Sequence, residues 1–367
     1  MIVKKEISLL QYILVINGVQ VGTSILSLPA ILAKDAGTDG WISIIIGWVI
    51  TTIISLAVVY LIAKHPGESM LQLLIRYLGT WLGKSVMVFW IVYLLLSAVT
   101  ILLMSVFIIQ EWILPKTPFY FLMILFVVNI YFIMRGGVQL IARYALFVFF
   151  FTLWLPLLLL IPLKDSEWIY LLPVLKEGWL PVLYTVRTTI LAFVGFELAF
   201  HFYPYLKNKQ HAAKGIVIAN TITLLVYLQI TLSCFVYFSP DEITRSLWPT
   251  LTLVKPIEFP FLERLEIIFL SFYIFVFLTS IVPYTFFALT NISELFNKRG
   301  WQLPYFFLLL LVVLSFFYSP SYAEIMLLKK WMAEVGYLAA YVFPVALFTY
   351  VALYTRWRGR ETNENAN

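Results

Sequence analysis

The sequence consists mostly of long apolar runs separated by short polar segments, and this feature restricts the possible folds more than any other. A helix needs about 20 apolar residues to cross a bilayer. Runs of this kind lie at about 8–33, 41–63, 83–112, 119–134, 141–162, 180–203, 214–238, 264–290, 304–318 and 335–355. We therefore expect an all-α polytopic membrane protein with about ten transmembrane helices.

The composition excludes most soluble classes of protein. Hydrophobic residues make up 62% of the chain and charged residues 12%, whereas a soluble domain carries about 25% charged residues. The net charge of +6 does not indicate nucleic-acid binding, because no folded basic domain is available to carry such a surface. The single cysteine, Cys234, provides neither a disulfide framework nor a Cys-rich metal site. We expect one membrane domain over residues 1–367, in contact with lipid.

The distribution of Lys and Arg predicts the orientation of the chain. When loops are assigned to alternate sides, the side with both termini holds more basic residues than the other, where Lys329 and Lys330 are placed in a loop. Cytoplasmic loops carry such an excess, so both termini are predicted to be cytoplasmic. Five runs form a first repeat at about 8–162, and five form a second at about 180–355, followed by a cytoplasmic tail at 356–367. Because five is odd, the second repeat is inverted relative to the first, as in many transporters.

The first run is interrupted near its middle by Gly22, Thr23 and Ser24, followed by Ile25. Glycine is unfavourable inside a helix and permits irregular backbone. Unwinding here frees N–H groups at the start of a new half-helix, and such an N-terminus favours a carboxylate. The alternative is that Gly18 and Gly22, four residues apart, form a small-residue surface for helix packing.

The sixth run contains a second interruption, Phe193-Val194-Gly195-Phe196-Glu197. Irregular backbone at membrane depth is tolerated only where it lines a protein cavity or is buried in protein. Unwinding here frees carbonyl groups that can accept from an ammonium. Together the two interruptions predict a site for a zwitterion near the midplane of the membrane, and an α-amino acid is the simplest such ligand.

Two charged residues in the sixth run are candidates for function, because ionisable groups inside a membrane are usually functional. Arg187 and Glu197 are ten residues apart, or about 15 Å along a helix, and do not pair with each other. Glu197 either contacts His201 or a neighbouring helix as a structural brace, or takes a direct ligand or proton role. Arg187 faces an aqueous vestibule, pairs with a carboxylate such as Glu111, or snorkels.

Four residues of the third and eighth runs are candidate walls of the same pocket, namely Ser97, Thr100, Thr279 and Tyr284. The sequence has no His/Cys/Glu cluster with metal-ligand spacing, no glycine-rich phosphate loop and no nucleophile elbow. We therefore expect neither an enzyme nor a cofactor.

The two interruptions, from Gly22 to Pro29 and from Ala192 to Glu197, resemble the signatures of the amino acid–polyamine–organocation transporter superfamily. This resemblance implies a LeuT-type fold with broken helices 1 and 6. More narrowly, the chain resembles the spore germination protein B-subunit family, the permease-like component of germinant receptors. The segments that carry this second resemblance are Lys64-His-Pro-Gly, Leu78-Gly-Thr-Trp-Leu-Gly83, Arg135-Gly-Gly-Val-Gln-Leu-Ile-Ala-Arg143 and Phe261-Leu-Glu-Arg-Leu-Glu266.

The second resemblance implies a nutrient receptor subunit in the inner membrane of a bacterial endospore. Its implied partners are a larger A-type subunit and a lipoprotein C-type subunit, and its ligand-contacting segments are Gly22–Ile25 and Phe193–Glu197. The fifth run, 141–162, has no mid-membrane lysine, which some proton-coupled relatives use. The alternatives are an amino acid permease working by alternating access, and an ion or water channel component.

Overall fold

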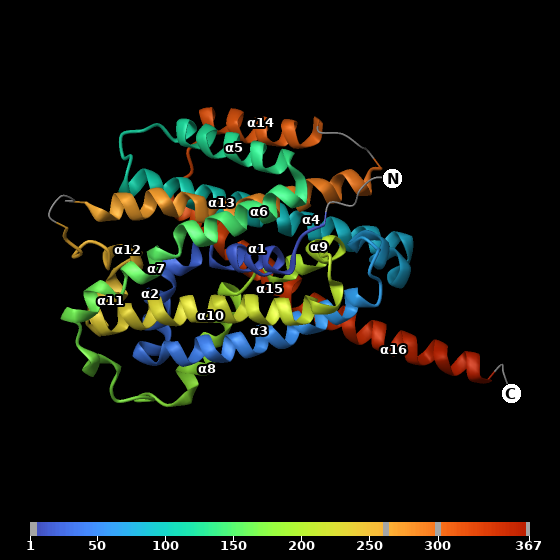
Figure 1. The fold of residues 1–367 in the computed structure, drawn as a ribbon, viewed down its shortest axis with the longest axis horizontal. Helices are drawn as coiled ribbons and strands as arrows, with labels where there is room; N and C mark the ends of the chain where they lie inside the picture. Colours follow the sequence, from blue (N-terminus) through green and yellow to red (C-terminus); the bar gives the residue numbers. More distant parts are fainter. Residues whose placement is uncertain (1–5, 260–263, 298–301, 365–367) are drawn as a thin grey trace.

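The computed structural model describes residues 6–259, 264–297 and 302–364, and within these ranges the regular structure is helical (Figure 1). Each predicted apolar run overlaps at least one helix. The α-helices are α1 (Leu9–Val21), α2 (Ser24–Ala36), α3 (Gly40–Ala63), α4 (Met70–Trp112), α5 (Phe119–Arg135), α6 (Gly137–Thr152), α7 (Trp154–Leu158), α8 (Trp179–Ala192), α9 (Ala199–Phe202), α10 (Ala212–Tyr237), α11 (Pro240–Arg245), α12 (Pro249–Thr252), α13 (Leu265–Leu295), α14 (Gln302–Phe317), α15 (Tyr322–Tyr337) and α16 (Phe343–Glu364). Of the family-like segment Phe261–Glu266, the first three residues lie outside the described ranges.

Within these ranges, six helical stretches are long and apolar enough to cross a membrane, and a bent pair, Trp179–Ala192 with Phe196–Tyr205, makes a seventh. Three shorter apolar helices, Leu9–Val21, Phe119–Arg135 and Pro304–Phe317, fall below this length. The chain is thus an all-helical protein of the membrane class, and the count of ten spans stays a prediction.

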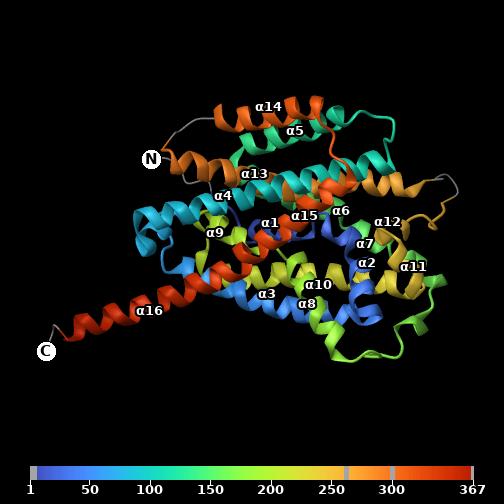
Figure 2. The ribbon, with the colours of Figure 1, turned by 180° about the vertical axis from the view of Figure 1, so that it is seen from behind.

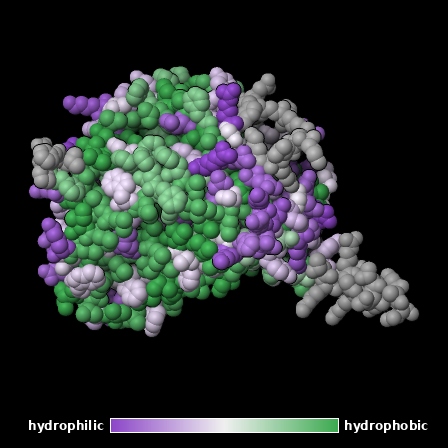
Figure 3. Space-filling model, viewed as in Figure 1, coloured by the Kyte–Doolittle hydropathy of each residue, from purple (hydrophilic) through white to green (hydrophobic). Residues whose placement is uncertain are grey.

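The long helices run side by side along the longest axis of the molecule (Figure 1). α13 packs along α4, α10 packs against α1 and α3, and α5 lies beside α14 at one edge. Figure 3 shows that apolar residues cover most of one face, while hydrophilic residues gather toward the end near the N-terminus. A bundle with such a continuous apolar exterior requires an apolar surrounding rather than water.

The first helix pair is broken where the sequence predicts an interruption. α1 begins with a capping box in which Ser8 and Gln11 bond each other's backbone N–H, and it ends at Gly22. Gly22 has φ of 30°, a conformation that residues with a Cβ rarely adopt. α2 then begins at Ser24, so glycine permits the change of direction at the end of α1.

The second break follows α8. The segment after α8 is bent by 41° from the helix axis, and Gly195 has φ of 129°. A Cβ on Gly195 would lie 2.8 Å from Cγ1 of Val19 and 3.1 Å from the backbone nitrogen of Gln20. Glycine is therefore favoured here for two reasons, its backbone angle and its close contact with α1. This contact also places the second break against the end of α1, next to the first break.

The last run is longer than the sequence predicts. α15 begins at Tyr322, with a capping box between Ser321 and Glu324, and continues through a π-helical turn at Leu338–Val342 into α16. Lys329 and Lys330 thus belong to a helix and not to the predicted loop, because the capping box starts the helix well before the sequence becomes continuously apolar. The helix also includes most of the predicted tail, and it projects from the bundle (Figure 2).

Candidate functional site

A cavity of about 280 Å³ lies at the first break, between α2, α4, α8 and α15. Its apolar wall includes Leu28, Ile101 and Met104. The polar side chains in its lining are those of Gln20, Thr23, Ser24, Ser27, Tyr93, Ser97, Thr100, Thr188, Tyr284, Lys329 and Lys330. No Asp or Glu is part of the described lining, so the local charge of the wall is positive.

The N-terminus of α2 opens on this cavity. Gly22, Thr23 and Ser24 all line it, and the N-cap residue Thr23 makes no side-chain capping hydrogen bond. Their contact with a ligand stays a prediction. The first N–H groups of a helix have no partner within the helix and carry a partial positive charge. The first turn of α2 can therefore donate to an anionic group in the cavity.

Two residues of α4 that line the cavity carry hydroxyl groups without a hydrogen-bond partner. Ser97 and Thr100 are each 2% exposed, and neither Oγ of Ser97 nor Oγ1 of Thr100 has a partner. Leaving a buried hydroxyl unpaired costs about 1–3 kcal/mol. A solute or water in the cavity would remove this cost, which makes these two hydroxyls the strongest sign of a ligand site.

Two carbonyl groups at the second break accept hydrogen bonds from side chains of other helices. Gln20 donates through Nε2 to the Phe193 carbonyl at 3.0 Å, and the Tyr227 hydroxyl donates to the Ala192 carbonyl at 2.8 Å. The Tyr227 hydroxyl also lies 2.7 Å from the Gln20 carbonyl at the end of α1. The carbonyls of Ala192 and Phe193 are therefore bonded by side chains of α10 and α1, and an open carbonyl for an ammonium stays a prediction for the rest of the break.

Among the predicted residues of the second break, only Val194 lines the cavity. The side chains of Phe193 and Phe196 are fully buried, and Phe196 packs against Tyr341. The backbone of Gly195 instead contacts α1. These residues shape the wall from behind and do not present groups to a ligand in this conformation.

Glu197 is fully buried and lies behind two residues of the cavity wall. The hydroxyls of Tyr93 and Tyr284 donate to its Oε1 at 2.7 and 2.9 Å, and the Gly195 N–H donates to its Oε2 at 2.7 Å. This geometry favours the bracing role, with an indirect link to the cavity through the two tyrosines. The described hydrogen bonds of Glu197 do not include His201, whose Nε2 accepts from Trp90.

Three further predictions have mixed outcomes. Arg187 is exposed and pairs with Glu334 at 2.6 Å, so a carboxylate partner exists but is not Glu111. Tyr284 lines the main cavity, and its contact with a ligand stays a prediction. Thr279 does not, and together with Ile25 it lines a separate cavity of about 80 Å³.

The alternative interpretation of the Gly18 and Gly22 pair is also supported. Thr279 donates to the Gly18 carbonyl at 2.9 Å, and a Cβ on Gly18 would lie 3.1 Å from the Thr279 side chain. A Cβ on Gly22 would lie 2.8 Å from Oγ of Ser280. Both glycines therefore permit close packing of α1 on α13, in addition to the backbone break at Gly22.

Sequence reasoning missed several groups of the cavity wall. Gln20, Ser27 and Tyr93 come from runs already predicted to line the site, and polar side chains in such runs are a usable signal. Gln20 is also held by α10, because it donates to Asn220 at 2.9 Å. Lys329 is not expected in the wall from the sequence, because it lies between the apolar runs 304–318 and 335–355, where the pattern predicts a loop.

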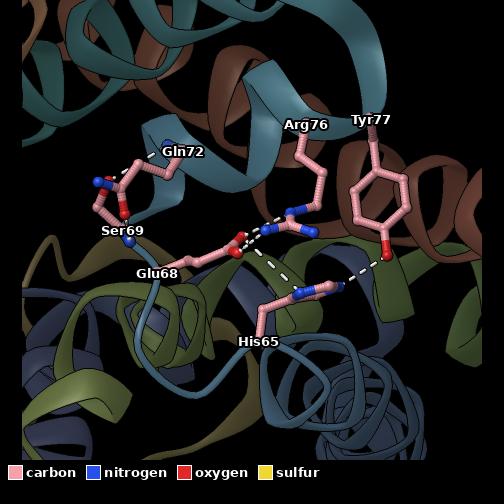
Figure 4. Close-up of polar contacts among 6 residues, drawn as sticks. All are labelled: His65, Glu68, Ser69, Gln72, Arg76 and Tyr77. Carbon is pink, nitrogen blue, oxygen red and sulfur yellow. Dashed lines mark hydrogen bonds and ion pairs between the residues drawn. The ribbon is translucent and has the colours of Figure 1, made fainter.

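A second polar cluster joins α3 to α4 and has a structural role (Figure 4). Glu68 pairs with Arg76 and lies 3.8 Å from His65, whose Nε2 is 2.7 Å from the Tyr77 hydroxyl. Ser69 caps α4 and also donates to Glu294 at the end of α13. The cluster includes the family-like segment that begins at Lys64. Within the described residues there is no group of three or more His, Cys, Asp or Glu that could hold a metal ion.

Comparison with known proteins identifies the family. The model of the family described as "Spore germination protein" matches residues 6–323. The chain belongs to the spore germination protein family. This finding confirms the family predicted from the sequence.

Individual members of the spore germination protein family align with most of the chain. Spore germination protein GerQB of Bacillus cereus is 26% identical over 334 residues, which cover 89% of this chain and 90% of the relative. Spore germination protein YndE of Bacillus subtilis (strain 168) is 28% identical over 365 residues, with coverage of 97% and 98%. Spore germination protein KB of the same strain is 26% identical over 330 residues, with coverage of 88% and 87%. The range matched by the family model includes the two breaks and the helices α2, α4 and α8 of the cavity wall, and it ends before most of α15.

Proposed function

We propose that this protein is a subunit of a nutrient germinant receptor and that it binds a small nutrient, an amino acid, in the cavity beside α2. The observation that carries the proposal is the meeting of an uncapped helix N-terminus with two unpartnered, buried hydroxyls, Ser97 and Thr100, in one cavity. A cavity of about 280 Å³ lies near the lower end of the range for small-molecule sites and admits one small solute.

The carboxylate of the amino acid binds at the first turn of α2, near Thr23 and Ser24. The ammonium binds at the hydroxyl oxygens of Tyr93 and Tyr284, in place of the occupied carbonyls of the second break. Both tyrosines use their hydrogen to bond Glu197, so their oxygen lone pairs remain to accept.

The overall architecture in this proposal is a five-plus-five inverted repeat of ten spans, with both termini on the cytoplasmic side of the inner membrane of an endospore. The breaks after α1 and after α8 open the two repeats, and their contact at Gly195 supports an equivalent position for them. Sites of inverted-repeat transporters lie at such paired breaks.

Signalling requires that the ligand bind one conformation more tightly than another, because a ligand with equal affinity for both does not shift the equilibrium between them. We propose that the cavity narrows around the ligand and that the change passes to A-type and C-type partner subunits. Membership of the spore germination protein family supports a receptor over the alternatives.

The test is to purify the protein in detergent and measure thermal stabilisation by a panel of amino acids, followed by uptake in liposomes. Stabilisation without uptake supports the receptor, and loss of germination in spores lacking the gene is the matching result in cells. Ligand-dependent uptake would favour the permease, and ion or water flux without uptake would favour the channel. The proposal fails if no amino acid stabilises the protein.

A further inference from the structure

Lys329 brings an uncompensated positive charge to the cavity wall. It projects from α15, is partly buried, and its Nζ lies 3.4 Å from Oγ of Ser27 on α2. Within the described residues it forms no ion pair. The two acidic residues of α15 are engaged elsewhere, since Glu334 pairs with Arg187 and Glu324 accepts from Ser321.

An ammonium without a counter-ion in a membrane domain is unfavourable, and such groups pair with a carboxylate or mark a ligand path. The cavity has no Asp or Glu in its described lining, so the missing partner cannot come from the wall. Glu197 is not in that lining either, and its described hydrogen bonds run to Tyr93, Tyr284 and the Gly195 N–H rather than to Lys329. The natural counter-ion for Lys329 is therefore a solute.

Lys329 lies at a different depth from the N-terminus of α2. Ser27 follows Ser24 by three residues, which corresponds to a rise of about 4.5 Å along the helix axis. The first-turn N–H groups and the ammonium are thus separate donor groups on one side of the cavity, about one helical turn apart. A ligand with a single carboxylate at the first turn leaves the ammonium without a partner.

We propose that the cavity takes an amino acid with an acidic side chain and that Lys329 determines this specificity by binding the second carboxylate. This inference rests on the proposed function, because it assigns the ligand class of the same site. The α-carboxylate lies at the first turn of α2, the side-chain carboxylate lies at Lys329 and Ser27, and the ammonium lies at Tyr93 and Tyr284.

The experiment measures the affinity of the detergent-purified protein for L-aspartate and L-glutamate, against their neutral amides L-asparagine and L-glutamine, by thermal shift and calorimetry. A hydrogen bond to a charged group contributes about 1.5–3 kcal/mol, so the better acid should bind roughly ten- to a hundredfold more tightly than its amide. The variant Lys329→Gln should remove this preference while retaining the binding of the amide. Lys34→Gln is the matched control, because Lys34 is exposed on α2 outside the cavity and should change nothing.

Two outcomes separate the inference from the proposed function. If neutral amino acids bind and the acids bind no better than their amides, the inference is overturned and the proposed function stands. If no amino acid binds, both are overturned. If Lys329→Gln fails to fold, the inference is tested by the preference of the native protein for the acid over its amide. The variant Lys329→Arg keeps the charge and should keep this preference.

Discussion

Replacing Thr100 by valine should weaken ligand binding without destabilising the protein. Valine has nearly the same shape as threonine, so the change removes the hydroxyl and leaves the packing of α4 intact. In the free protein this hydroxyl is 2% exposed and has no partner. Its removal therefore breaks no hydrogen bond.

The substitution should leave the stability of the free protein unchanged or higher, and it should lower the affinity for the ligand. An unpaired buried hydroxyl costs about 1–3 kcal/mol, so the free energy of unfolding of the free Thr100→Val protein should be unchanged or higher by up to this amount. In the bound protein the ligand bonds the hydroxyl, and a typical bond contributes about 0.5–1.5 kcal/mol. The dissociation constant should accordingly rise roughly two- to tenfold.

The assay is thermal unfolding in detergent with and without ligand, and Thr189→Val provides the matched control. Thr189 is fully buried outside the cavity lining, and its Oγ1 donates to the carbonyls of Ser43 and Val186, each at 2.9 Å. The control should lose about 1–3 kcal/mol of stability and keep its affinity. The reasoning is refuted if Thr100→Val destabilises the free protein as much as Thr189→Val does, or if it leaves the affinity unchanged.

Three further predictions concern the brace, the link between the breaks and the orientation. Glu197→Gln keeps an acceptor for the two tyrosine hydroxyls but loses the one for the Gly195 N–H, so it should cost less in thermal unfolding than Glu197→Ala, which leaves three donors unpaired and should cost about 3 kcal/mol or more. The Gln variant should retain most of the ligand response with an unaltered pH dependence, and a flattened pH profile at normal protein level would contradict the brace. Tyr227→Phe should lower the free energy of unfolding by about 1–3 kcal/mol, measured in the same way, because the Gln20 and Ala192 carbonyls lose the one hydroxyl hydrogen that they share. In a Cys234→Ala background, Ser166→Cys should react with an impermeant maleimide added outside and Lys207→Cys should not, and the reverse pattern would overturn the predicted orientation.

The breaks could be predicted from the sequence because glycine inside an apolar run weakens the helix locally and permits backbone angles that other residues avoid. Gly22 and Gly195 both occupy positive φ, and no longer-range information is needed to expect irregular backbone there. Ser97 and Thr100 can be expected together in a pocket wall because they are three residues apart and share one face of α4.

Other parts of the site depend on packing between distant segments. Thr279 and Tyr284 are five residues apart on α13, which places them about 140° apart around a helix, so only one can face the cavity. The occupation of the freed carbonyls by Gln20 and Tyr227 depends on how α1 and α10 dock against α8. Lys329 belongs to the cavity wall because its segment forms a helix, α15, that packs beside the cavity.

The hydroxyl of Tyr227 has consequences for how the two halves of the protein communicate. It lies within bonding distance of the Gln20 carbonyl, near the end of α1, and of the Ala192 carbonyl, at the end of α8. A phenol carries one hydrogen, so these two helix ends compete for a single proton and one of them is always the poorer acceptor. If a ligand draws one half-helix away by a few tenths of an ångström, the hydroxyl turns and donates its hydrogen bond to the carbonyl of the other. This redirection costs only about 1 kcal/mol. A movement at one break thus changes the hydrogen bonding at the other through the rotation of one O–H bond.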